Sequence, residues 1–184
     1  MTSKNGPSPR TLRYTGIHPV QEQWFAVRTP FKREKLAQSD LQRQGVETYL
    51  PLLHEVRRYA SKNREVNIPL IRSYLFVRIN EAGYHPVVAC PWVSGFIRFG
   101  DHIVAVPEEE MDLLRRIVGE AGLTEAEQGL FEEGDQVEII GGKLTGIRGT
   151  LVERKGKNQV AVALQVIGYS LIMDIDPAHL RRLP

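Results

Sequence analysis

The sequence predicts an α+β protein in which an α/β sandwich of mainly antiparallel strands and flanking helices precedes a small C-terminal β-barrel. The segment 69–79, PLIRSYLFVRI, has the composition of a strand in the middle of a sheet. Helical patterns stand before and after it, and from Glu132 onward short alternating strands follow at regular turns. The predicted divisions are a disordered extension at 1–23, an α/β domain at 24–118, a flexible acidic linker at 119–131 and a barrel at 132–184.

The central strand is apolar on both faces. A period of two places Leu75, Val77 and Ile79 on one face, and Tyr74 and Phe76 on the other. Both faces therefore need cover. The domain's own helices can supply one cover, and we expect another protein to cover part of the aromatic face.

The first helix is expected to follow a strand at 24–28 and to run from about Pro30 to Gln44. Thr29 suits its N-cap, and Gly45 suits its C-terminal end. One face is modestly apolar. The opposite face is basic and polar, with Lys32, Arg33, Lys35, Gln42 and Arg43.

A later helix is expected between Pro107 and Gly119, with acidic residues in its first turn and arginines in its last. One apolar stripe contains Met111 and Leu114, and a second contains Leu113. A helix that is apolar on two sides is expected to pack against a different element or partner on each side.

Between these helices the sequence predicts further strands. Residues 46–68 indicate a long hairpin with a basic tip around Tyr59, and 95–99 with 102–106 indicate two short strands. A short helix, broken near Pro86 or Pro91, is expected after Asn80.

Composition excludes several classes of protein. The chain has 184 residues, a formal net charge of +2 and no apolar run long enough to span a bilayer or to form a signal peptide. We therefore expect a cytoplasmic protein without membrane attachment. We also expect a monomer. Cys90 is the only cysteine and lies in an apolar segment, where a small core residue is a better interpretation than a nucleophile beside His85 or His102.

No catalytic motif is present, and the histidines show no metal-ligand spacing. We expect no enzyme activity, no metal and no cofactor. Basic groups on the first helix and at the hairpin tip could hold phosphates, and Tyr59 could stack on a base. Composition alone favours the simpler interpretation of solvated surfaces.

Two sets of motifs then narrow the interpretation. GDQVEIIGGKLTGIRGTLVE at 134–153 resembles the KOW motif, with glycines at turn positions. WFAVRT at 24–29, LIRSYLFV at 70–77 and WVSGFIRFG at 92–100 resemble the N-terminal (NGN) domain of NusG-type transcription elongation and antitermination factors. The order of NGN domain, linker and KOW barrel is that family's architecture. The lead-in Ile71-Arg72-Ser73-Tyr74, in place of Phe-Pro-Gly-Tyr, is closer to specialised RfaH- or UpxY-like paralogues than to housekeeping NusG.

The resemblance implies a set of binding residues. Those implied for the clamp helices of bacterial RNA polymerase are Tyr74, Phe76, Phe99, Met111 and Leu114, with His85 near a second polymerase contact. For non-template DNA the resemblance implies first-helix positions near Asp40, Arg43 and Gln44, of which Asp40 departs from the family. Lys32 and Arg33 are predicted to bind nucleic acid from their place among the basic groups of the same helix. The implied partner loop of the KOW barrel, which binds ribosomal protein S10 or Rho in NusG, is Ile167-Gly168-Tyr169. This loop lacks the arginine of the family's Phe-Gly-Arg pattern.

The resemblance implies a bridging function: the N-terminal domain would hold the polymerase clamp closed across the DNA channel and so suppress pausing or termination, on particular operons. The alternative is a KOW-type RNA-binding or ribosome-associated protein. A third and weaker alternative is a nucleic-acid-processing enzyme that uses Cys90.

Overall fold

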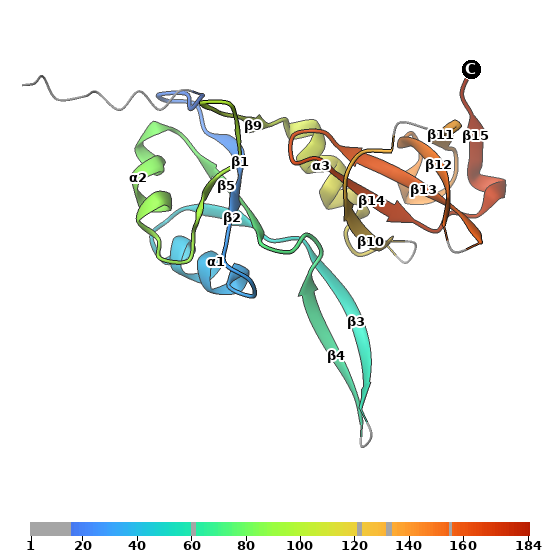
Figure 1. Ribbon diagram of the computed structural model, residues 1–184, viewed down its shortest axis with the longest axis horizontal. Helices are drawn as coiled ribbons and strands as arrows, with labels where there is room; N and C mark the ends of the chain where they lie inside the picture. Colours follow the sequence, from blue (N-terminus) through green and yellow to red (C-terminus); the bar gives the residue numbers. More distant parts are fainter. Residues whose placement is uncertain (1–15, 60–61, 121–122, 132–133, 155) are drawn as a thin grey trace, which may run out of the picture.

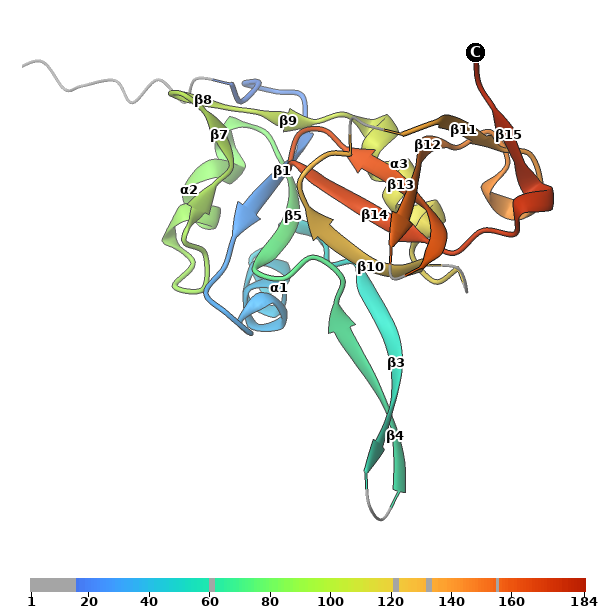
Figure 2. The same cartoon turned by 45° about the vertical axis from the view of Figure 1, so that its right-hand side comes forward.

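The computed structural model describes residues 16–59, 62–120, 123–131, 134–154 and 156–184. Its first half is an antiparallel sheet between helices, and its second half is strand-rich (Figures 1 and 2). The predicted α+β fold class is confirmed. No helix among the described residues is long and apolar enough to cross a membrane.

The first sheet has the strand order β2-β5-β1-β6, with β9 also paired to β1. Its strands are β1 (Gln23–Arg28), β2 (Glu47–Tyr49), β5 (Tyr74–Ile79), β6 (Gly95–Phe96) and β9 (Ala105–Val106). Strand β5 lies between β1 and β2. The central position predicted for this strand is therefore correct, although it starts at Tyr74, after a turn at 70–73, and not at Pro69.

The two faces of β5 enter two different cores. Leu75, Val77 and Ile79 pack with buried residues of helices α1 (Glu34–Arg43) and α2 (Glu81–Ala89). Tyr74 and Phe76 join the second core, which also contains buried residues of α3 (Glu108–Ile117). The two-faced pattern predicted from the sequence is confirmed.

The helix boundaries differ from expectation in two places. Helix α1 begins at Glu34 after a turn, and Arg33, not Thr29, is its N-cap. The side chain of Thr29 is buried, and its backbone N–H donates to the Ser73 carbonyl at 2.9 Å. Helix α2 is not broken at Pro86, which lies inside it, but ends at Ala89, shortly before Pro91.

A long two-stranded hairpin, β3 (Leu52–Tyr59) and β4 (Lys62–Pro69), projects away from the rest of the molecule (Figure 1). A second, small hairpin pairs β7 (Arg98–Phe99) with β8 (His102–Ile103). The structure describes the backbone of the long hairpin except at 60–61, but not the side chains at 57–64, which include the basic groups predicted at the tip.

The C-terminal half is an antiparallel sheet of order β10-β14-β13-β12-β11-β15, which curls into the predicted small barrel. Its strands are β10 (Leu123–Gln128), β11 (Gln136–Ile139), β12 (Arg148–Arg154), β13 (Lys157–Leu164), β14 (Tyr169–Met173) and β15 (Leu180–Arg182). Short 3-10 turns lie at Gly142–Leu144 and Pro177–His179.

Two predicted boundaries are wrong. Residues 16–23 are not a disordered extension: Ile17 is buried in the core beside α1 and α2, and the His18 carbonyl accepts from the Glu81 N–H at 3.1 Å. The remainder of the predicted extension, 1–15, lies outside the described residues. Within the predicted flexible linker, Leu123–Gln128 form strand β10 of the barrel.

Candidate functional site

Four residues predicted to bind polymerase form one apolar surface. Tyr74 and Phe76 project from β5, and Met111 and Leu114 project from α3. They share a cluster, and their exposed fractions are only 6%, 1%, 0% and 1%. We call these four residues the apolar face. The sequence predicted which residues gather here, but not that they would be buried within the chain itself.

The barrel covers this apolar face. Leu164 at the end of β13 and Ile167 in the following loop meet Phe76, Met111 and Leu114, and the contact leaves no room for a water molecule. The ring of Tyr169 stands edge-on to that of Tyr74, with centroids 5.4 Å apart and planes at 72°. This is a favoured aromatic geometry. We call this the closed arrangement.

Polar contacts at the rim of the interface join the same parts. The carboxylate of Glu110 accepts hydrogen bonds from the backbone N–H groups of Gln165, at 3.0 Å, and Val166, at 3.5 Å. Burial raises the pKa of Glu110, and the two N–H donors oppose that rise. Farther along α3, the guanidinium of Arg116 donates to the carbonyls of Lys143 and Thr145 at 3.1 and 3.0 Å.

The predicted partner loop of the barrel lies in the same interface. Ile167 is buried in the shared core, Tyr169 packs against it, and Gly168 has a φ of +67°, which glycine adopts without strain. The closed arrangement therefore hides the apolar face and the barrel loop against each other.

Two other residues predicted to bind polymerase lie apart from the apolar face. Phe99 is on β7 with 62% of its surface exposed, and His85 is exposed on α2. Neither belongs to the cluster that holds Tyr74. If they contact a partner, they do so from a part of the surface that the barrel leaves open.

The four residues predicted to bind nucleic acid fall at opposite ends of α1. The ammonium of Lys32 lies 5.1 Å from the Phe31 ring centroid, and the guanidinium of Arg33 lies 5.4 Å from the ring centroid of Trp92. At the other end, Arg43 and Gln44 both donate to Asp40, at 2.8 and 3.3 Å. These positions do not form one surface.

A groove at the start of α1 gathers basic residues that the prediction did not group. It has a volume of about 490 Å³ and is lined by Phe31, Lys32, Glu34, Lys35, Asn67, Ile68, Pro69 and Arg72. Phe31 is 64% exposed. Lys35 donates to the Asn67 carbonyl at 2.7 Å, and buried Glu34 accepts from the Ser73 N–H at 2.7 Å, so α1 is fixed to the chain before β5. Sequence reasoning missed that Arg72, in the turn before β5, lies beside the basic residues at the start of α1.

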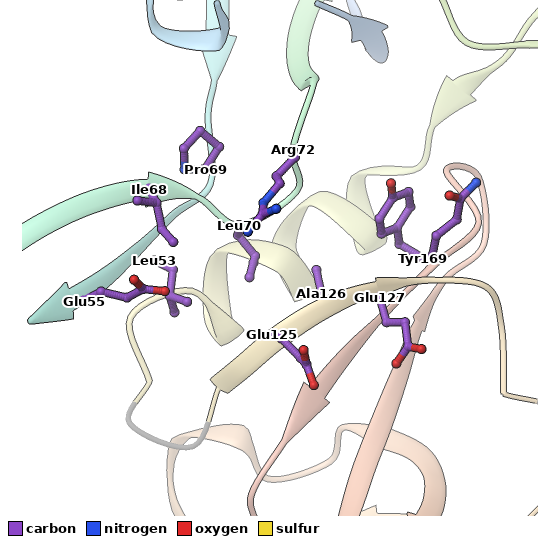
Figure 3. Close-up of a pocket in the computed structure, with 11 residues that line it drawn as sticks. Leu53, Glu55, Ile68, Pro69, Leu70, Arg72, Glu125, Ala126, Glu127 and Tyr169 are labelled. Carbon is purple, nitrogen blue, oxygen red and sulfur yellow. The ribbon is translucent and has the colours of Figure 1, made fainter. Parts of the chain in front are cut away.

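Figure 3 shows a second pocket, of about 510 Å³, between the hairpin base and the barrel. Leu53, Ile68 and Leu70 line one side, and β10 with Tyr169 lines the other. Both halves of the molecule thus contribute walls.

Nothing in the described part of the chain forms a metal site, since no cluster of three potential ligands occurs there. Cys90 is buried and not in a disulfide, and burial is the main reason that the pKa of its thiol is raised. A raised pKa disfavours the thiolate that a nucleophile needs, so the core interpretation fits better.

The fold is an α/β sandwich followed by a strand-rich half, with an apolar face on β5 and α3. Comparisons with known proteins show which family has this architecture. The family model "Transcription termination factor nusG" matches residues 22–115. The chain belongs to the NusG family.

Two characterised relatives are each named "Transcription termination/antitermination protein NusG". The protein of Thermus thermophilus is 26% identical over 175 residues, covering 84% of this chain and 95% of the relative. That of Pseudomonas aeruginosa is 25% identical over 161 residues, covering 85% of this chain and 90% of the relative. These relatives indicate a function in transcription.

A solved structure described as "Domain interaction in Thermotoga maritima NusG" has the same fold, with a TM-score of 0.54 and 21% identity. The match covers 89% of this chain and 98% of that one.

Proposed function

We propose that this chain is a transcription elongation and antitermination factor that binds bacterial RNA polymerase through the apolar face. The observation that carries the proposal is the convergence of Tyr74, Phe76, Met111 and Leu114 on one surface between β5 and α3. A helical partner such as the clamp helices would lie on this surface in place of the barrel, because an amphipathic helix needs an apolar surface of this kind.

Binding requires that the closed arrangement open. The residues that would meet polymerase are at most 6% exposed in it. Only the fraction of molecules that is open can bind, so the apparent dissociation constant rises as that fraction falls. Once bound, the factor acts by preferring one polymerase state over another: tighter binding to the closed clamp disfavours the paused state.

The groove at the start of α1 supports a contact with non-template DNA. Lys32, Lys35 and Arg72 supply positive charge for phosphates, and exposed Phe31 supplies a ring on which a base can stack. Arg33, whose guanidinium lies over the Trp92 ring, would contact nucleic acid beside this groove, and Arg43 and Gln44 would form a separate contact at the far end of the helix.

The barrel would offer its loop to a second partner after opening. Ile167, Gly168 and Tyr169 occupy the position used for ribosomal protein S10 or Rho in the family. Because the arginine of the family pattern is replaced by Tyr169, we propose that recognition here is apolar and aromatic.

Action on specific operons is proposed from the turn before β5. Ser73 has a φ of +62°, and Arg72 beside it lines the basic groove. A sequence-reading contact at this groove would recruit the factor to particular templates in the cytoplasm.

The test is elongation by bacterial RNA polymerase in vitro over pause sites and a Rho-dependent terminator, with and without the protein. We expect shorter pauses or more readthrough on a template that carries the leader of its own operon. The same assay is run with the variant Glu110→Arg with Arg116→Ala, which weakens the interface between the domains. Unchanged pausing and readthrough on every template, with both the native chain and this variant, would refute the proposal.

The alternative, a KOW-type RNA-binding or ribosome-associated protein, makes a different prediction. The variant Tyr74→Ala with Phe76→Ala would then leave polymerase binding intact and retain RNA or ribosome binding. Loss of polymerase binding in a variant that stays folded by circular dichroism favours the elongation factor.

A further inference from the structure

Strand β10 is an edge strand made from the segment that joins the two domains. It pairs with β14 alone among the described strands, in the antiparallel register Glu125↔Ile172, Ala126↔Leu171, Glu127↔Ser170 and Gln128↔Tyr169. The register slips between Leu123 and Glu125. Part of the segment that joins the two domains therefore forms a strand of the barrel.

The composition of β10 is poor for a strand. Half of its six residues, Glu125, Ala126 and Glu127, are of types that are depleted in sheets. Among the side chains of β10 that the structure describes, Leu123 alone is buried, whereas its partner β14, YSLIM, is buried over Ser170–Met173. Little apolar burial holds β10 on the barrel by itself.

The first domain lies beside β10. Leu123 belongs to the apolar cluster that spans both halves of the molecule and contains Leu70 and Ile71 as well as Met173, its partner on β14. In Figure 3, Ala126 points to the opposite side of β10 from Glu125 and Glu127, and β10 forms one wall of the pocket whose other wall is the hairpin base. Separation of the two domains would remove the hairpin base from its place beside β10.

Beyond β10 the chain is attached to the barrel independently. Phe131 packs on Val152, Ala161 and Ile172, in a cluster separate from the domain interface. Its carbonyl accepts from the Thr150 hydroxyl at 3.1 Å. Phe131 is thus a fixed point that does not depend on the first domain.

We propose that β10 is a releasable strap, meaning a strand that detaches from β14 when the domains separate. Its release lengthens the chain between α3 and the barrel and so sets how far the barrel can move from the first domain. With β10 docked, the segment between α3 and the barrel is residues 118–122. With β10 released up to the Phe131 anchor, it is residues 118–130. At about 3.5 Å per extended residue, the reach grows from about 17 Å to about 45 Å.

Hydrogen–deuterium exchange of the full chain tests the release. We expect the β10 segment to exchange at least about tenfold faster than β13, and to accelerate further in Arg116→Ala or Glu110→Arg, which weaken the interface while β13 is unchanged. Solution X-ray scattering of the same samples reports whether the domains separate. Separation without faster exchange in β10 would show a permanent barrel strand and overturn the proposal.

A disulfide tests the reach. Glu127 and Ser170 face each other across β10 and β14, and Glu153 and Asn158 face each other across β12 and β13. Each pair is replaced by two cysteines in the Glu110→Arg chain with Cys90→Ala. Oxidising the 127–170 pair should shorten the maximum dimension measured by scattering, and reduction should restore it.

Oxidising the control pair should leave the maximum dimension unchanged. Equal dimensions for the oxidised and reduced 127–170 pair would overturn the proposal. Neither outcome depends on polymerase binding, so failure here is distinct from failure of the proposed function.

Discussion

At the scale of single residues, Glu110 joins the two domains through its carboxylate, as Arg116 does through its guanidinium. Its carboxylate lies in the first turn of α3 and accepts from two N–H groups of the barrel loop. Burial raises its pKa above the ordinary 4.5 in the closed arrangement. Closing is therefore coupled to protonation of Glu110. The stability that protonated Glu110 gives to the closed arrangement is fully present below about pH 4.5, and it is lost as the pH rises through the raised pKa.

The substitution Glu110→Gln should remove this pH dependence because an amide stays neutral. The chemical shift of the Val166 amide, followed by NMR from about pH 4 to 7, measures the closed fraction. Glu109→Gln, on the same turn but exposed, is the control and should keep the native profile. An unaltered profile in Glu110→Gln would show that another group controls closing.

Glu34 has a different role, since it holds the turn that precedes β5. It is 3% exposed, and its bond to the Ser73 N–H supports a serine in the left-handed region. Glu34→Ala should lower the free energy of unfolding by about 1–3 kcal/mol, because the half-buried N–H of Ser73 loses its acceptor. Urea unfolding compared with Lys35→Ala, whose exposed side chain should matter less, measures the difference. A smaller loss in Glu34→Ala than in the control would contradict this role.

At the scale of elements, the barrel depends on close approach between β12 and β13. A Cβ added at Gly149 would lie 2.6 Å from the Ala161 carbonyl oxygen. Gly149→Ala should therefore push the strands apart and destabilise the barrel by about 1–3 kcal/mol. Thermal unfolding compared with Arg148→Ala, an exposed neighbour on the same strand, checks this expectation. Equal melting temperatures would mean that the barrel accommodates the methyl group.

The sequence predicted elements well where a local pattern decides them. Alternation identified both faces of β5, and the apolar stripes of α3 predicted that it packs on two sides. Strand β10 was missed because half of its residues are of types depleted in sheets and it shows no apolar alternation. It forms by pairing with β14, and Leu123 joins an apolar cluster that spans both halves of the molecule; neither feature is local in the sequence.

At the scale of the whole molecule, one apolar cluster runs from the sheet through α3 into the barrel interior. The sequence identified the partners of this cluster as binding surfaces but could not show that they bind each other. The four residues of the apolar face and the loop at 167–169 are separated by at least 53 positions, from Leu114 to Ile167. Periodicity predicts that an apolar face must be covered. The tertiary structure is needed to show that the chain's own barrel covers it.

The central claim is that the barrel competes with polymerase for the apolar face. It is tested most directly by the affinity of the full chain for bacterial RNA polymerase, compared with that of the variant Glu110→Arg with Arg116→Ala, which keeps the apolar face intact. If the closed arrangement predominates, opening it should tighten the apparent dissociation constant, by about tenfold for a tenfold rise in the open fraction. Equal or weaker binding by a variant that scattering shows to be open would contradict the account.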